Sequence, residues 1–412
     1  MKRITVEPRK NHEKIVEEQG VVYNRDVDNN GNITSYWNEL AAYVLSYDEV
    51  ERLEDATEEI HNMIVSEVIP FVIEEQENKN SPFQLALPDH AKDFIKNSYE
   101  RGDKDIYGRF DLVYRGDEIK MLEYNADTPT GLIEASIAQW DWVQEKFPNE
   151  DQWNWIHEAL IARFAKIKSS TGKTGILYFA HSEEDESGED ASTTTYMRDC
   201  ASQAGWDTIG INMKEIGYDS NTDEIIGIIY DEENDTFDIL ENLFKLYPWE
   251  DMMYEEFGEI FSRKQPIWFE PAWKMPISNK MISAAAWHVF PDHPYLLKTY
   301  VHDPYDLNDF VKKPLYGREG DHIDIFFDKK HILKSDVYTS RWGKEGYVYQ
   351  EFCPLPNYIG SKGEPNHVVL GSWVVGGESV GLGIRESNGL ITDENCRFVP
   401  NVIDKTGSLS YL

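Results

Sequence analysis

Polar side chains recur at alternate positions in one stretch of the chain, from Ile106 to Leu132. Alternate residues of an extended strand share a face, so a β-hairpin turned at Gly116 would bring two polar rows opposite each other. Mg²⁺ prefers carboxylate and amide oxygens as ligands, and arginine suits a phosphate or carboxylate beside them. The pattern predicts either a metal and anion site or a solvated edge hairpin with scattered charges. The polar set comprises Arg109, Asp111, Glu123, Asn125 and Asp127.

Three later stretches carry residue types that bind anions or nucleotides. Residues 312–320 (KKPLYGREG) place lysines before a loop with Gly317 and Gly320, where backbone amides can approach an anion closely. The order of a P-loop is absent, and a basic hairpin turn is the alternative. Gln350 and Glu351 end a predicted strand and are candidates for contacts to an adenine edge. Arg385 follows a glycine-rich stretch and is either a second anion clamp or a surface arginine.

Composition limits the class of protein. The chain has 412 residues with 41% hydrophobic and 13% aromatic residues, which predicts a large core and two or three packed units. Its formal net charge of −35 argues against nucleic acid and anionic membranes as partners and would attract polyamines. An acidic proteome in the source organism is the alternative cause of that charge. Three widely spaced cysteines, and no apolar run resembling a signal peptide or membrane span, predict a cytoplasmic protein without disulfides.

The remaining pattern predicts helices first, then strand–helix alternation, then short strands. Apolar residues from Tyr36 to Val44 form a helical stripe, and a long helix follows a capping box at Asp48 and Glu51, with Pro70 kinking or ending it. Alternation between 174 and 230 predicts a small unit with a partly parallel sheet. Its acidic run at 182–190 is either a solvated loop or a cation-binding lip. We expect a helical region (1–105), the hairpin with following helices (106–170), the small α/β unit (171–248) and a nucleotide-binding region (249–412).

The order of these motifs resembles that of a known family. GRFDLVYRGDEIKMLEYNADTPTG is followed by EPAWK, NK, KKPLYGREG, QEF and GLGIRE. This order is similar to the synthetase domain of the glutathionylspermidine synthase and trypanothione synthetase family, over roughly Tyr23 to Leu412. Members of that family are ATP-grasp ligases. The resemblance implies an α/β (mixed α+β) ATP-grasp-type fold with a helical N-terminal region and a small α/β insertion.

The resemblance also implies roles for individual residues. Asp111, Glu123 and Asn125 match the family's magnesium ligands, Arg109 the arginine that stabilises the acyl phosphate and tetrahedral intermediate, and Arg385 a late arginine near the phosphoryl group.

The other matched residues are implied to contact nucleotide or substrate. Lys280 and Lys313 match two lysines that hold the nucleotide phosphates, and Gly317 and Gly320 belong to a loop that resembles the lid over the triphosphate. Gln350 and Glu351 lie where the ATP-grasp hinge contacts adenine. Thr128 and Thr130 match positions that contact the acid substrate or the phosphoryl group.

The activity that the resemblance implies is ATP- and Mg²⁺-dependent ligation of a small-molecule acid to an amine through an acyl phosphate. The substrates are expected to be of the peptide and polyamine classes, and the protein a monomer or homodimer with no nucleic-acid or membrane partner. The alternatives are an ATP-grasp amino-acid or peptide ligase with other substrates, and a non-catalytic nucleotide-binding relative. Bifunctional members carry an N-terminal amidase domain with a catalytic cysteine. The first hundred residues contain no cysteine, so we expect no amidase activity.

Overall fold

A five-stranded antiparallel sheet forms the centre of the protein. The structure is a computed structural model that describes residues 1–27, 33–171, 175–229, 236–263, 266–335, 341–393 and 395–409. The expected hairpin is confirmed, because β5 (Tyr107–Arg115) pairs with β6 (Glu118–Asn125) across a turn in which Gly116 has φ +65°. The strand order is β21-β20-β19-β5-β6, with β19 at His367–Val375, β20 at Glu378–Ser387 and β21 at Arg397–Phe398.

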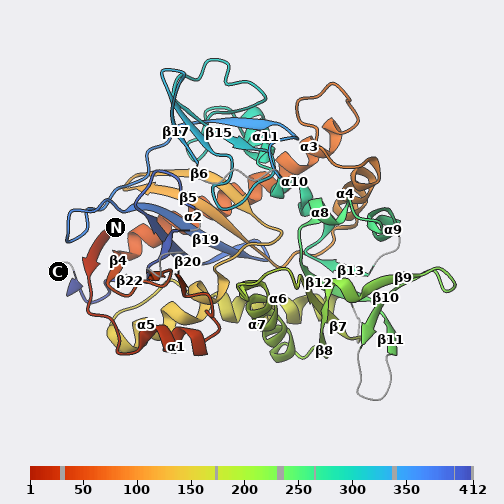
Figure 1. Ribbon diagram of the computed structural model, residues 1–412, viewed down its shortest axis with the longest axis horizontal. Coiled ribbons are helices and arrows are strands. Elements are labelled where there is room, and N and C mark those ends of the chain that lie inside the picture. Colours follow the sequence, from red (N-terminus) through yellow and green to blue (C-terminus); the bar gives the residue numbers. More distant parts are fainter. Residues whose placement is uncertain are drawn as a thin grey trace.

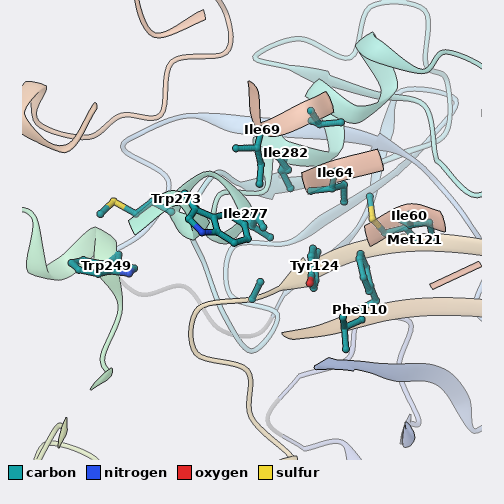
Figure 2. Close-up of a cluster of buried hydrophobic side chains, with 14 of the residues drawn as sticks. Ile60, Ile64, Ile69, Phe110, Met121, Tyr124, Trp249, Trp273, Ile277 and Ile282 are labelled. Carbon is teal, nitrogen blue, oxygen red and sulfur yellow. The ribbon is translucent and has the colours of Figure 1, made fainter. Parts of the chain in front are cut away.

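A long helix covers one face of this sheet. It comprises α2 (Tyr47–Met63), a π-helical turn η1 (Ile64–Val68) and α3 (Ile69–Glu75), and α4 (Asp89–Arg101) follows. Figure 2 shows Ile60 and Ile64 packed against Met121 and Tyr124 of the hairpin strand. Pro70 does not end the helix. The π-helical turn directly before it is the kind of local adjustment that accommodates a proline, which lacks the N–H and crowds the preceding turn.

Two details of the N-terminal region differ from the prediction. The capping box is formed by Ser46 and Glu49, two residues before the predicted pair Asp48 and Glu51. Ala41–Leu45 is a strand, β4, although the stripe around it predicted a helix. All five residues of β4 are buried, and a fully buried strand has no alternation that would distinguish it from a buried helix.

The two ends of the chain share a small sheet (Figure 1). β4 lies between β1 (Lys2–Thr5) and β22 (Asn401–Ile403), and α1 (His12–Glu18) and the pair β2 (Arg25–Val27) and β3 (Ile33–Ser35) complete this part. Region 1–105 therefore holds strands as well as the predicted helices. Behind the central sheet, η2 (Glu134–Ala138), α5 (Gln139–Lys146) and α6 (Ile156–Thr171) follow the hairpin.

The expected small α/β unit is present and contains a parallel sheet. Its strand order is β13-β12-β7-β8, and α7 (Glu189–Gln203) connects β7 to β8. The strands are β7 (Leu177–His181), β8 (Thr208–Asn212), β12 (Asn242–Leu246) and β13 (Ile267–Phe269). An antiparallel sheet extends it, made of β9 (Ile216–Asp219), β10 (Glu224–Ile229) and β11 (Thr236–Ile239), with η3 at Met213–Glu215. The predicted outer ends at Thr174 and Tyr230 lie outside the described residues.

A second antiparallel sheet lies at the top of Figure 1, and we call it the lid sheet. Its order is β14-β18-β15-β16-β17, with β14 at Thr299–Val301, β15 at Phe310–Pro314, β16 at Asp324–Phe327, β17 at Lys330–Lys334 and β18 at Tyr347–Glu351. Short helices link it to the rest: α8 (Trp249–Met252), α9 (Gly258–Arg263), η4 (Ala272–Lys274), α10 (Met275–Ser278) and α11 (Met281–Val289).

Two absences bear on the sequence predictions. The three cysteines, Cys200, Cys353 and Cys396, are free and buried. Within the described ranges, no helix is both long and apolar enough to cross a membrane. The boundaries of the four regions stay a prediction.

Candidate active site

One cavity of about 380 Å³ lies between the central sheet, the lid sheet and the segment after β6. Small-molecule sites typically have volumes of roughly 300–1,000 Å³. The structure brings every candidate site residue of the sequence to its wall, although they come from positions 109 to 385. They are Arg109, Asp111, Glu123, Asn125, Thr128, Thr130, Lys280, Lys313, Gly317, Gly320, Gln350, Glu351 and Arg385.

The hairpin brings its two polar rows into register. Arg109 lies opposite Asn125, and Asp111 lies opposite Glu123. Asp111 accepts a hydrogen bond from Arg109, whose Nε lies 2.9 Å from Oδ1, and its other oxygen accepts one from Arg385 of β20. Burial disfavours the charge of Arg385, but Asp111 outweighs it and raises the pKa of the guanidinium. Two arginines therefore clamp one carboxylate on the cavity wall.

A close approach of backbone to side chain explains one glycine beside this clamp. A Cβ atom on Gly371 of β19 would lie 3.0 Å from Cδ of Arg109. The glycine therefore leaves room for the arginine to lie flat on the sheet.

Glu123 lies among cations on the side of the lid sheet. Lys280 places Nζ 3.0 Å from Oε2 of Glu123, and Asn125 donates to Oε1 at 3.1 Å. Burial opposes ionisation of Glu123, yet Lys280 and Lys313 outweigh it and hold the pKa of the carboxyl well below its usual value. Burial lowers the pKa of Lys313 to about 8, against the attraction of Glu123. Lys313 also donates to Oε1 of Gln350 at 2.7 Å, so the two lysines and the end of β18 form one wall.

The loop at 317–320 is fixed to both sides of the cavity. Lys280 donates a hydrogen bond to the carbonyl oxygen of Gly317 at 2.9 Å. Gly320 adopts φ +73°, and a Cβ atom added to it would lie 2.8 Å from a side-chain carbon of Ile391, so only glycine fits there. Arg318 donates to Oε1 of Glu250 at 2.6 Å. Arg318 lies within the predicted anion-binding stretch 312–320, but its pairing with Glu250 was not predicted, because an ion pair across 68 residues has no local signal.

Asp127 departs from its predicted position. We expected it to share a face with Glu123 and Asn125, but β6 ends at Asn125 and the chain turns away. The carboxylate of Asp127 is buried and accepts from Lys245 and from the backbone N–H of Trp249 instead. The following segment returns to the clamp, because the carbonyl oxygen of Thr130 accepts from Arg109.

A second, acidic group lies beyond Thr130, and the sequence did not identify it as a unit. Glu134 is fully buried, and neither carboxylate oxygen has a hydrogen-bond partner within 3.5 Å among the described residues. Oε1 of Glu189 accepts from the backbone N–H of Gly131 at 3.4 Å. Burial and the neighbouring Glu134 and Asp190 raise the pKa of Glu189 to about 8. The acidic run at 182–190 was the one signal in the sequence for this group.

Aromatic hydroxyls complete the acidic end. Tyr23 and Tyr36 line the cavity there, and burial together with the charges of Glu134 and Glu189 raises the pKa of both phenols well above normal. The phenols therefore stay protonated and able to donate hydrogen bonds at neutral pH. The cavity thus has a cationic end at the two lysines and an acidic end at Glu189, which lines the cavity and lies near the buried Glu134, together with the arginine clamp.

The hairpin side chains also include oxygen donors that could bind a metal ion. No group of three histidine, cysteine, aspartate or glutamate side chains in the described part of the chain is arranged to hold a metal ion. The hairpin offers two carboxylates and one amide oxygen, from Asp111, Glu123 and Asn125. Mg²⁺ is usually held by one or two carboxylates together with water and substrate phosphates, so this smaller set fits it.

Comparison with known proteins identifies the family. The family model described as glutathionylspermidine synthase preATP-grasp matches residues 3–404. A protein of Haemophilus influenzae named "Putative acid--amine ligase" is 36% identical over 375 residues, which cover 89% of this chain and 90% of that protein. The trypanothione synthetase of Crithidia fasciculata is 24% identical over 337 residues, 74% of this chain. The match covers 48% of that relative, so the chain spans about half of its length.

A solved structure agrees on the fold. The glutathione synthetase-like effector of Globodera pallida, in its apo form, has a TM-score of 0.52 at 9% identity, covering 95% of this chain and 98% of its own. A likeness at this identity concerns the fold alone, and the predicted mixed α/β ATP-grasp-type fold is confirmed. The chain belongs to the glutathionylspermidine synthase family, a group of ligases that join a carboxylic acid to an amine.

Proposed function

We propose that this protein is an ATP- and Mg²⁺-dependent carboxylate–amine ligase that works through an acyl phosphate. One observation carries the proposal: Arg109, Arg385, Lys280 and Lys313 converge on a single cavity in a chain whose net charge is −35. Asp111 pairs with both arginines and Glu123 with Lys280, so these two carboxylates offset two of the four positive charges. Such a cluster is explained by a strongly anionic ligand such as a nucleotide triphosphate.

The reaction follows from the chemistry of the acid. A carboxylate is a poor acyl donor, because its leaving group would be oxide. In the first step a carboxylate oxygen bonds to the γ-phosphorus of ATP, the bond from that phosphorus to the β–γ bridging oxygen breaks, and ADP leaves. In the second step the amine nitrogen bonds to the acyl carbon, loses a proton, and phosphate leaves. The products are an amide, ADP and phosphate.

The residues of the cationic end suit the nucleotide. We assign the phosphates to Lys280 and Lys313, and the adenine edge to Gln350 and Glu351 at the end of β18. The loop with Gly317 and Gly320 covers the phosphates. Phosphoryl transfer depends on alignment and charge neutralisation rather than on a protein nucleophile, and this set supplies both.

The hairpin suits the metal and the reacting carbon. Asp111, Glu123 and Asn125 would hold Mg²⁺, which neutralises phosphate charge when bound. Arg109 and Arg385, which clamp Asp111 in the free protein, would stabilise the negative charge that develops on the acyl group. Thr128 and Thr130 would contact the acid substrate from the segment beside Arg109.

The acidic end suits a protonated amine. Glu189 lines the cavity, and a bound ammonium group would favour its ionised form and lower its raised pKa. The hydroxyl oxygens of Tyr23 and Tyr36, which also line the cavity, can accept hydrogen bonds from the ammonium group. The substrates are small molecules, and a short peptide acid with a polyamine is the first pair to test. The reaction would take place in the cytoplasm, with the protein a monomer or homodimer.

The proposal is tested by ADP release with panels of acids and amines. We expect Asp111→Ala, Glu123→Ala and Lys313→Ala each to abolish turnover while circular dichroism shows retained folding. Asp117→Ala is the matched control, since Asp117 lies at the exposed turn of the same hairpin, away from the cavity wall, and forms a surface ion pair with Arg52. Near-normal turnover in all three cavity variants would overturn the assignment.

The same panels separate the alternatives. A preference for α-amino acids over polyamines would identify an amino-acid or peptide ligase. Binding of Mg-ATP by calorimetry, with no turnover on any pair, would identify a non-catalytic relative.

A further inference from the structure

A buried lysine of the small α/β unit, Lys245, binds Asp127, a residue of the cavity wall. Lys245 lies in β12, and its side chain is fully buried. Nζ donates to Oδ1 of Asp127 at 2.8 Å and to the carbonyl oxygen of Tyr247 at 2.8 Å, and it lies 4.3 Å from the ring centroid of Trp249. The ammonium group is therefore held from three directions in one orientation.

This arrangement is costly to bury. Burial lowers the pKa of Lys245, and Asp127 opposes that effect by attracting the charged form. A buried ion pair is weak evidence for stability, because desolvation of both ions offsets much of their attraction. An apolar pair at this place would have served a core equally well. We therefore look for the role of the ion pair in the segments that Asp127 contacts.

Asp127 determines where the substrate-side segment lies. It stands two residues after Asn125 and directly before Thr128, both on the cavity wall. Three residues further on, the carbonyl oxygen of Thr130 accepts from Arg109. A shift of Asp127 would thus move Thr128 and the acceptor of the arginine that faces the reacting carbon.

The same carboxylate also fixes helix α8. Oδ2 of Asp127 accepts from the backbone N–H of Trp249, the first residue of that helix, at 2.9 Å. The indole of Trp249 is anchored in the hydrophobic cluster of Figure 2 and donates to the carbonyl oxygen of Glu270. The next residue, Glu250, holds Arg318 of the loop over the cavity. Helix α8 therefore lies between the substrate-side segment and that loop.

We infer that Lys245 is a positioning residue of the ligase site, which fixes Asp127 and thereby both segment 126–131 and helix α8. It touches no reacting atom and acts through the Asp127 carboxylate. The inference rests on the proposed function for its effect on turnover, but not for its effect on the backbone. The small α/β unit thus contributes directly to the geometry of the ligation site.

The test compares three variants. Lys245→Met removes the charge and keeps the length of the side chain. The double variant Lys245→Met with Asp127→Asn also removes the stranded carboxylate, while the new amide oxygen can still accept from Trp249. Arg9→Met is the matched control, because Arg9 and Glu39 form an equally buried ion pair at 2.7 Å whose residues do not line the cavity.

Two measurements separate positioning from stability alone. In Lys245→Met we expect amide hydrogen exchange in segments 126–131 and 249–252 to accelerate by about tenfold or more. Arg9→Met should leave both segments unchanged. In the double variant the midpoint of urea unfolding should return toward that of the wild type, whereas kcat should stay at least about tenfold low, since small misplacements of reacting groups are costly.

Each outcome decides the question. If the double variant regains both stability and turnover, Lys245 serves stability only and the inference fails. Unchanged amide exchange at 126–131 in Lys245→Met would also overturn the inference. If Lys245→Met is too unstable for kinetics, turnover is measured on the double variant and the exchange result still decides. A wild type with no turnover on any substrate pair would refute the proposed function, yet the exchange arm would still test the positioning of Asp127.

Discussion

Replacing Glu189 with glutamine should stabilise the free protein at alkaline pH. In the folded protein burial and the neighbouring Glu134 and Asp190 raise the pKa of Glu189 to about 8, from an ordinary 4.5. Between these two pH values the folded state keeps a proton that the unfolded state has released. Stability then falls as pH rises through this window, because the unfolded state binds fewer protons than the folded one. Glutamine keeps the acceptor for Gly131 and removes the titration.

The size of the effect has a ceiling set by the two pKa values. At about 1.36 kcal/mol for each pH unit, the interval from 4.5 to about 8 corresponds to at most about 5 kcal/mol. Glu189 is only partly buried by its side-chain exposure and shares its environment with Glu134, so the ceiling must be discounted. We expect Glu189→Gln to gain about 1–3 kcal/mol over the wild type at pH 8.5 and close to nothing near pH 4.5.

Urea unfolding at pH 5, 7 and 8.5, followed by circular dichroism, measures this difference directly. Titrating groups that do not interact with Glu189 are common to both proteins and cancel in the comparison, whereas the effect on Glu134 and Asp190 is part of the measured difference. Glu186→Gln is the control, since Glu186 lies on the same acidic run but is exposed, and it should show no growth of stability with pH. A gain for Glu189→Gln that is equal at pH 5 and 8.5 would refute the reasoning, because it would come from packing rather than from proton linkage.

Three further variants test other parts of the structure. Arg109→Ala should leave ATP affinity nearly intact and slow turnover by roughly 10²–10³-fold; a large loss of nucleotide affinity with unchanged turnover would contradict its role. Gly320→Ala should raise the KM for ATP, because its φ is +73° and the new Cβ would meet Ile391, whereas Gly363→Ala, at φ +85° in open space, should not. Ser46→Ala removes the cap of α2 and should lower unfolding free energy by about 1 kcal/mol in urea titrations without changing kcat.

Local signals predicted the parts of the site that lie within one hairpin. Gly116 at the turn and the alternation of polar residues along each strand predicted that Arg109, Asp111, Glu123 and Asn125 share one hairpin. A β-bulge between the pairs Leu112–Met121 and Asp111–Glu123, which the alternation did not predict, sets the register that places them opposite each other. The family resemblance supplied the distant residues, such as Lys280 and Lys313, which no periodicity connects to the hairpin.

The sequence could not predict contacts that depend on packing between units. In the sequence, Asp127 continues the alternation of β6, but the strand ends two residues earlier. The carboxylate of Asp127 instead accepts a hydrogen bond from Lys245, more than a hundred residues away in the sequence. Glu134 resembled an ordinary helical glutamate. Only the position of α7 against η2 turns it into a buried carboxylate facing the acidic run.

The raised pKa of Glu189 affects both the stability of the free protein and the reaction proposed for the cavity. Ligation requires an anionic acid and a cationic amine to meet. In the cavity, Arg109 donates to the carbonyl oxygen of Thr130, and Glu189 accepts from the N–H of the next residue, Gly131, so a cation and a carboxyl group contact adjacent residues of one segment. The amine must also lose a proton before its nitrogen can attack. A carboxylate whose pKa lies near neutral pH is a stronger base than a carboxylate with the ordinary pKa. Burial raises the pKa of Glu189 to about 8 and so costs the free protein stability at alkaline pH. In the proposed reaction Glu189 would accept the proton of the amine at pH values above about 8, where it is itself ionised. Glu189→Gln should therefore lose turnover at pH 8.5, where it gains stability.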